Sequence, residues 1–190
     1  MKRVVILASG SGTLAQAIFD ARQNQLKGAD IVAVISDKAD AQVLDRALAA
    51  SVESFVVPML EDRSAWDRKL ETLIAALKPD LVVSAGFMRI LSKRVVEKFK
   101  VINSHPSLLP LFPGAHAVRD ALAAGAKETG TTIHWVDAGL DTGEVIAQER
   151  LEILATDTEE SLHERIKILE RGLIVATIAQ VLSNLEKTNG

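Results

Sequence analysis

Cysteine is absent from the 190 residues of this chain. Its absence excludes disulfide bonds, thiolate nucleophiles, iron–sulfur clusters and cysteine-ligated zinc, so any demanding chemistry must rest on other side chains. Histidine occurs four times, and no two histidines have the H-x-x-x-H spacing that places two ligands on one face of a helix. We therefore expect no metal site.

Long hydrophobic runs are also missing. The apolar segment Val4–Leu7 near the start of the chain is too short for the core of a signal peptide or for a membrane span. Neither sign of charge dominates, and the formal net charge of −3 predicts no basic surface for a nucleic-acid backbone or an anionic membrane. We expect a cytoplasmic protein whose partners are small molecules, with no nucleic acid and no membrane.

The composition predicts a packed globular core, because 48% of the residues are hydrophobic and 25% are charged. The length is usual for one domain, and we find no internal repeat, low-complexity segment or linker. One domain over residues 1–190 is therefore expected, as a monomer or a homodimer.

Short apolar runs rich in β-branched residues alternate with stretches of helical period in the first half of the chain. Their continuous hydrophobicity predicts strands covered on both faces, as in a parallel sheet flanked by helices. Residues 131–136 and 143–148 instead suggest antiparallel strands that pair as a hairpin-like extension, and a long helix is expected from about Asp157. The prediction is a Rossmann-like α/β fold with a mostly parallel central sheet and antiparallel strands in the C-terminal half. The predicted strands of the first part are Val4–Leu7, Ile31–Ile35, Phe55–Val57, Leu81–Val83 and Val101–Ile102.

A glycine-rich turn, Gly10 to Ala15, follows the first predicted strand and fits the pattern G-x-G-x-x-A. Backbone N–H groups at the start of the following helix can hold a phosphate, because glycine permits close approach and the helix dipole favours anions. Two alternatives remain open for this motif. It can be a tight turn that needs glycine for packing alone, or a dinucleotide site in which Asp37 binds a ribose hydroxyl, as in an NAD-linked dehydrogenase.

Two side chains that suit acyl chemistry, Asn103 and His105, stand two residues apart after an apolar run. In an extended segment both leave the same face of the backbone and can converge on one ligand atom. An amide donor beside a histidine suits a developing oxyanion combined with acid–base catalysis, and Asp141 could orient the imidazole and raise its pKa. Each piece taken alone also fits a hydrogen-bonded turn.

The other histidines carry less information. A structural role for His134 is at least as good an interpretation as a catalytic one, because it lies on an alternating strand. His116, in a loop after Phe112 to Ala115, could lie near a ligand. We expect His163, early in the last helix, to lie in solvent.

Three segments together resemble the folate-dependent formyltransferase family: Asn103 to Pro110, Gly86 to Leu91 and Asp137 to Gly143. The resemblance runs from Val4 to the last helix. It implies formyl transfer from 10-formyltetrahydrofolate, a co-substrate, to the glycinamide amine of 5-phosphoribosylglycinamide, a step of purine synthesis. Hydrolysis of the formyl donor is the nearest chemical alternative, since the same oxyanion site can serve water.

Residue roles also follow from the resemblance. Catalysis would fall to Asn103, His105 and Asp141. The phosphate of the phosphorylated substrate would contact Gly12, Thr13 and Leu14. Lys167 and Glu170 on the last helix would also contact this substrate, and a hydrolase would not need these two residues. The folate would contact Arg63, Met88, Arg89, Ile90, Leu91, Asn103, Asp137, Ala138, Gly139, Leu140 and Asp141.

The chain departs from the family pattern at Leu14, where many relatives carry asparagine. Only the backbone N–H of Leu14 can therefore serve a phosphate, and affinity would rest more on Gly12, Thr13 and Lys167. The resemblance also predicts a cis peptide bond between Leu109 and Pro110.

Overall fold

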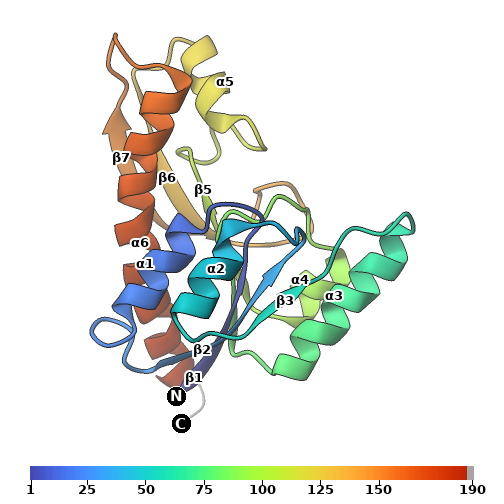
Figure 1. The fold of residues 1–190 in the computed structure, drawn as a ribbon. Helices are drawn as coiled ribbons and strands as arrows, with labels where there is room; N and C mark the ends of the chain where they lie inside the picture. The colour runs from blue at the N-terminus through green and yellow to red at the C-terminus, as the bar shows by residue number, and fades with distance from the viewer. Residues whose placement is uncertain (188–190) are drawn as a thin grey trace.

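A seven-stranded sheet in the order β3-β2-β1-β4-β5-β6-β7 forms the centre of the protein (Figure 1). The computed structural model describes residues 1–187, so the last three residues of the predicted domain 1–190 lie outside the described residues. The predicted mixed α/β fold is confirmed, and most strands extend a few residues beyond the apolar runs. The strands are β1 (Lys2–Leu7), β2 (Ala29–Ser36), β3 (Ser54–Val56), β4 (Leu81–Ser84), β5 (Val101–His105), β6 (Glu128–Trp135) and β7 (Val145–Glu152).

The first five strands are parallel, and their hydrophobicity is continuous because helices cover both faces of the sheet. Val4 to Leu7 of β1 are all fully buried at the centre of the sheet. The predicted hairpin-like extension is also confirmed, since β6 pairs antiparallel with both β5 and β7. The switch from parallel to antiparallel pairing falls between β5 and β6, beside the carboxyl end of β5.

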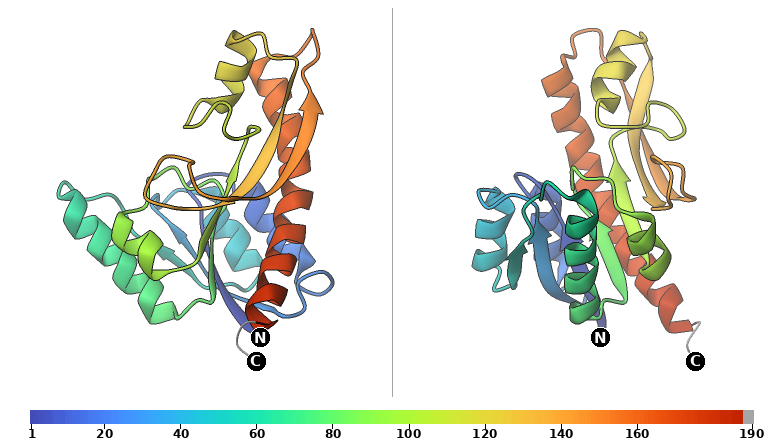
Figure 2. Two further views of the ribbon diagram at one scale, coloured as in Figure 1. Left: turned by 180° about the vertical axis from the view of Figure 1, so that it is seen from behind. Right: turned by 90° about the vertical axis from the view of Figure 1, so that its right-hand side faces the viewer.

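Helices on the two faces of the sheet enclose separate parts of the core (Figure 2). Side chains of α1, α2 and α6 pack on one face, and side chains of α3 and α4 on the other. A smaller cluster joins α5 to α6. The helices are α1 (Thr13–Ala21), α2 (Gln42–Ala49), α3 (Arg63–Leu77), α4 (Lys93–Lys98), α5 (Ala117–Ala123) and α6 (Glu159–Lys187).

The last helix, α6, begins at Glu159, and the predicted capping residues Asp157 and Thr158 precede it. The backbone N–H of Ser161 donates to Oγ1 of Thr158 at 3.1 Å, and the N–H of Thr158 donates to Oγ of Ser161 at 3.0 Å. Among residues 1–187 no helix is both long and apolar enough to cross a membrane.

The carboxyl ends of β1, β4 and β5 lie side by side, and each continues into a loop. Ligands of open parallel sheets bind at this edge. The glycine turn follows β1, residues 85–92 follow β4, and the loop with the cis bond between Leu109 and Pro110 follows β5. The predicted cis bond is confirmed.

Candidate active site

Four polar side chains meet at the carboxyl end of β5. Asn103 and His105 come from β5, His134 comes from β6, and Asp141 comes from the loop between β6 and β7. Oδ2 of Asp141 lies 3.4 Å from Nδ1 of His105, and Oδ1 of Asp141 lies 3.6 Å from Nε2 of His134. The structure thus brings together the three predicted catalytic residues and adds a second histidine.

Both ring nitrogens of His105 face oxygen acceptors. Nε2 donates to the carbonyl of Phe112 at 2.9 Å, and Nδ1 faces the Asp141 carboxylate. A neutral imidazole carries one N–H, so only the protonated ring supplies a donor to both oxygens. Burial nevertheless lowers the pKa of His105, and the Phe112 carbonyl and the Asp141 carboxylate only partly oppose that effect. The expected effect of Asp141, which raises the pKa of His105, is therefore confirmed, but burial is the larger effect and the net direction is downward.

Asp141 is fixed by its backbone as well as by its neighbours. Its φ of 53° lies in the left-handed region, which a short polar residue tolerates better than most. The backbone N–H of Gly114 donates to Oδ2 of Asp141 at 2.8 Å and ties this loop to the one that follows β5. Burial raises the pKa of Asp141, but the contacts with His134, Gly114 and His105 outweigh burial and lower it overall. Asp141 therefore stays ionised at neutral pH.

His134 is the site residue whose role the sequence left undecided. In the antiparallel register it pairs with Asn103, so both side chains leave the same face of the sheet. Nδ1 of His134 donates to the carbonyl of Trp135 at 2.8 Å, so in the neutral ring Nε2 carries no proton and accepts from Nδ2 of Asn103 at 3.2 Å. A protonated ring would instead direct the Nε2 proton toward Asp141. This contact orients the Asn103 amide: one N–H of its amide group donates to His134, and the second N–H is available to another acceptor. The alternation of the 131–136 segment was the only sequence signal for His134, and the pairing register was not readable from it.

The glycine turn after β1 leads into α1 without a side-chain cap. Gly12 has a φ of 71° and precedes the first residue of α1, and no side chain caps that helix start. A Cβ on Gly12 would lie 2.5 Å from Cγ2 of Val43 on α2, so packing also requires glycine here. Packing therefore accounts for glycine at this position, and phosphate binding at the first N–H groups of α1 stays a prediction beside it. Leu14 is buried and offers only its backbone, whereas Thr13 is half-buried at the helix start.

The loop after β4 lies on the α3 side of the sheet. Phe87 stacks on Trp66 of α3 with ring centroids 6.3 Å apart, and Nη2 of Arg63, the first residue of α3, donates to the carbonyl of Ile90. Met88 and Ile90 expose 66% and 63% of their surface, so this loop presents two apolar side chains to solvent. Arg63 and the Met88–Leu91 segment, predicted to bind one ligand, are therefore neighbours.

The dinucleotide alternative fails at Asp37. The side chain of Asp37 is completely buried, and its Oδ2 accepts from Nε of Arg89 at 2.6 Å. A carboxylate engaged in this way cannot reach a ribose hydroxyl in the crevice.

On α6, Glu170 is buried and its Oε1 accepts from the hydroxyl of Ser104 at 2.7 Å. Ser104 stands between Asn103 and His105, so Glu170 packs against the opposite face of β5. Burial raises the pKa of Glu170, and the hydrogen bond from Ser104 opposes this only in part. Lys167, one turn earlier, forms an ion pair with Glu164 at 2.6 Å.

The loop between β6 and β7 is built around Asp137. Its carboxylate accepts from the backbone N–H of Gly139 at 3.0 Å and from the hydroxyl of Thr142 at 2.8 Å. A Cβ on Gly143 would lie 1.7 Å from the carbonyl oxygen of Trp135, so the return to β7 requires glycine. These contacts carry the loop, with Ala138 and the half-exposed Leu140, back toward His105 and fix Asp141.

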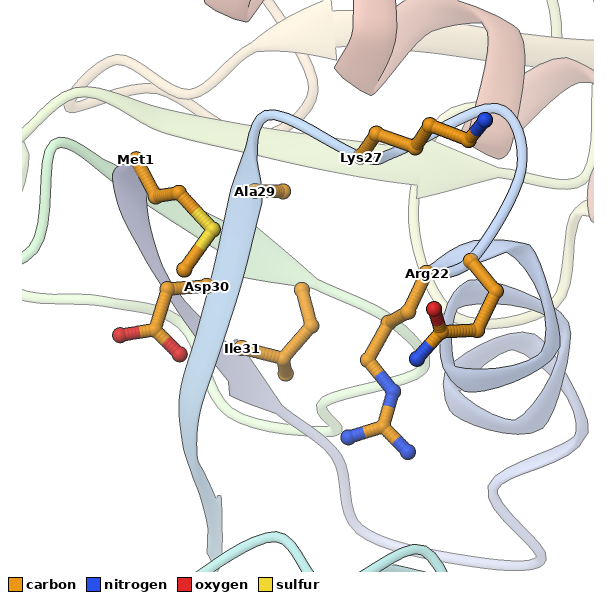
Figure 3. A pocket seen from close by; sticks show the side chains of 7 residues that line it. Met1, Arg22, Lys27, Ala29, Asp30 and Ile31 are labelled. Atoms are coloured by element: carbon orange, nitrogen blue, oxygen red, sulfur yellow. The ribbon is translucent and has the colours of Figure 1, made fainter.

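Two other histidines lie outside this arrangement, as do two depressions, one at the amino end of β2 and one between β3 and α3. His116 is exposed immediately before α5, and His163, expected to lie in solvent, is half-buried on α6, where burial lowers its pKa. The depression of about 310 Å³ in Figure 3 is lined by Arg22, Lys27 and Asp30 among others and lies at the amino end of β2. Among the described residues, no three His, Asp or Glu side chains are placed to hold a metal ion.

Residues 2–178 match the formyl transferase family, and the chain belongs to that family.

Particular relatives narrow the comparison. A phosphoribosylglycinamide formyltransferase of Mycobacterium tuberculosis is 47% identical over 96% of this chain and 86% of its own length. The trifunctional purine biosynthetic protein adenosine-3 of Drosophila melanogaster is 40% identical over 96% of this chain, a match to 14% of that longer protein. The crystal structure of glycinamide ribonucleotide transformylase 1 from Symbiobacterium toebii has a TM-score of 0.91 and 39% identity, covering 94% of this chain and 86% of that chain.

Proposed function

We propose that this protein transfers the formyl group of 10-formyltetrahydrofolate to the glycinamide amine of 5-phosphoribosylglycinamide, a step of purine synthesis. The observation that carries the proposal is the cluster of Asn103, His105 and Asp141 at the carboxyl end of β5. The names of the relatives support the same reaction. The amine nitrogen would form a bond to the formyl carbon, and the bond from that carbon to N10 of the folate would then break. The proton lost by the amine balances the one that N10 gains.

Asn103 and His105 would stabilise the negative charge that develops on the formyl oxygen. The second N–H of the Asn103 amide is available because His134 engages the first. His105 would donate from Nε2, whose present acceptor, the Phe112 carbonyl, belongs to a loop without regular secondary structure. A developing oxyanion raises the pKa of a neighbouring imidazole, so His105 would gain a proton when it is needed.

Asp141 would accept the proton that leaves the amine. Its carboxylate stays ionised and lies within 3.4 Å of His105, so it would hold an imidazolium there by charge and accept the amine proton directly or through water.

The two substrates would approach this centre from opposite faces of the sheet. The phosphate would sit at Gly12, Thr13 and Leu14 at the start of α1, and the ribonucleotide would pass Lys167 and Glu170 of α6, which packs on the same face as α1. The folate would occupy the α3 side, along the Met88–Leu91 segment and the Asp137–Asp141 loop, with Arg63 at its glutamate end. The reacting atoms would then meet over Asn103.

The test measures tetrahydrofolate formation from 10-formyltetrahydrofolate with and without 5-phosphoribosylglycinamide. We expect turnover that requires the amine, and His105→Ala should lower kcat by about 10²–10³-fold while the far-ultraviolet circular dichroism stays unchanged. Equal rates without the amine would identify a hydrolase instead. Wild-type turnover in His105→Ala would contradict the proposed catalytic role of this cluster.

A further inference from the structure

The segment Gly86–Leu91 has no regular secondary structure, so other parts of the chain must fix its position. Three elements do so at successive residues. The backbone N–H of Met88 donates to Oγ of Ser9 at the end of β1 at 2.8 Å, Nε of Arg89 donates to Asp37 after β2, and the carbonyl of Ile90 accepts from Arg63. Of these contacts, the one between Arg89 and Asp37 joins two opposite charges.

The Asp37 carboxylate is poorly satisfied for a buried charged group. Its side chain has no exposed surface, its Oδ2 accepts from Arg89, and its Oδ1 is buried with no hydrogen-bond partner among the described residues. Burial of an oxygen without a hydrogen bond disfavours the folded state. Replacement of such an ion pair by apolar side chains is often neutral or stabilising, so stability does not account for the carboxylate.

The geometry at Arg89 indicates that the Asp37 carboxylate holds the Arg89 side chain in place. The Arg89 side chain is 35% exposed and reaches from the end of β4, past β1, to the end of β2. Without the Asp37 charge, that side chain could extend into solvent, and residues 88–91 would lose the contact that holds them toward β2. The main chain of this segment would then sample several positions.

We propose that Asp37 is a positioning residue for the formyl donor, which acts through Arg89 on the Met88–Leu91 segment. The inference rests on the proposed function, because that segment is the predicted folate contact. The Asp37 side chain has no exposed surface, so it would reach the folate only through Arg89. Its loss should weaken binding of the folate, leave binding of the ribonucleotide unchanged and leave the chemical step unchanged once the folate is bound.

The experiment is a double-mutant cycle with Asp37→Asn and Arg89→Gln, followed by steady-state kinetics for each substrate. Asp37→Asn should raise the KM for 10-formyltetrahydrofolate on the order of tenfold, with kcat and the KM for 5-phosphoribosylglycinamide within about twofold of wild type. In the Arg89→Gln background, Asp37→Asn should not raise the KM for 10-formyltetrahydrofolate any further, because the guanidinium that Asp37 holds is already absent. Asp30→Asn is the matched control at the other end of the same strand, where Asp30 lies 3.8 Å from Arg3, and it should leave all constants unchanged.

Each outcome decides the inference separately from the function. If the wild-type protein shows no formyl transfer, the proposed function itself is wrong. With an active wild type, the positioning role is wrong if Asp37→Asn leaves the folate KM unchanged, raises the ribonucleotide KM instead, or acts equally in the Arg89→Gln background. Should Asp37→Asn fold poorly, Arg89→Gln breaks the same pair from its exposed end and must by itself raise the folate KM.

Discussion

Asn103 of β5 and His134 of β6 lie directly opposite each other in the antiparallel pair, with Nδ2 of the amide 3.2 Å from Nε2 of the imidazole. The contact fixes which way the amide faces, because the carbonyl of Trp135 holds the other ring nitrogen of His134. We therefore expect His134 to act through Asn103 on the proposed oxyanion site.

Replacement of His134 by phenylalanine removes this acceptor and keeps the ring volume. We expect kcat to fall about tenfold with little change in either KM, because the amide loses its orientation only where charge develops. Steady-state kinetics of His134→Phe, Asn103→Ala and the double variant measure this. Effects that multiply in the double variant would contradict a role through Asn103, since His134→Phe should add little once the amide is gone.

The buried His105 predicts a pH dependence of stability. Its pKa is lower in the folded protein than the ordinary 6.5, so between the folded pKa and 6.5 the unfolded chain binds more protons. Stability should therefore fall as the pH drops below 6.5 and level off below the folded pKa. Urea unfolding of wild type and His105→Gln between pH 5 and 7.5 isolates this contribution, since the variant should lack it. An identical pH dependence in both proteins would show that burial does not shift this histidine.

The buried Glu170 predicts a pH dependence of stability opposite in sign to that of His105. Its pKa is raised above the ordinary 4.5, so stability should fall as the pH rises from 4.5 through the folded pKa. Glu170→Gln keeps an acceptor for Ser104 and removes the charge, so the variant should be more stable than wild type at pH 7.

The same variant should bind 5-phosphoribosylglycinamide more weakly, if Glu170 meets that substrate. Glu160→Gln, an exposed position in the first turn of the same helix, serves as the control for both measurements. Lower stability of Glu170→Gln at pH 7 would contradict a destabilising buried charge.

Two glycines of the first turn should respond differently to alanine. Gly12→Ala places a Cβ 2.5 Å from Val43 at a φ of 71°, and we expect a loss of about 2–4 kcal/mol in the free energy of unfolding. Gly10→Ala meets nothing within 4 Å and should change stability by less than about 1 kcal/mol. Urea unfolding of the two variants compares them. Equal losses would mean that α2 does not pack on the turn as described.

Much of this architecture could be predicted from local pattern. Continuous apolar runs such as Val4–Leu7 and Leu81–Val83 indicated buried parallel strands, because only strands with both faces covered are hydrophobic throughout. The spacing of Asn103 and His105 predicted a common side, since side chains alternate along a strand. The resemblance of the flanking segments then indicated the reaction and named Asp141.

Other features depended on contacts between residues far apart in the chain. The partnership of His134 with Asn103 required the register between β5 and β6, which no local pattern specifies. The net lowering of the His105 pKa required knowledge of burial, because Asp141 alone would raise it. Asp37 stands at the spacing of a ribose-binding residue, and only the packed structure shows it buried and bound to Arg89. Sequence by itself determined the elements and the chemical groups, whereas tertiary packing decided which groups touch, which are buried and therefore which charges each can carry.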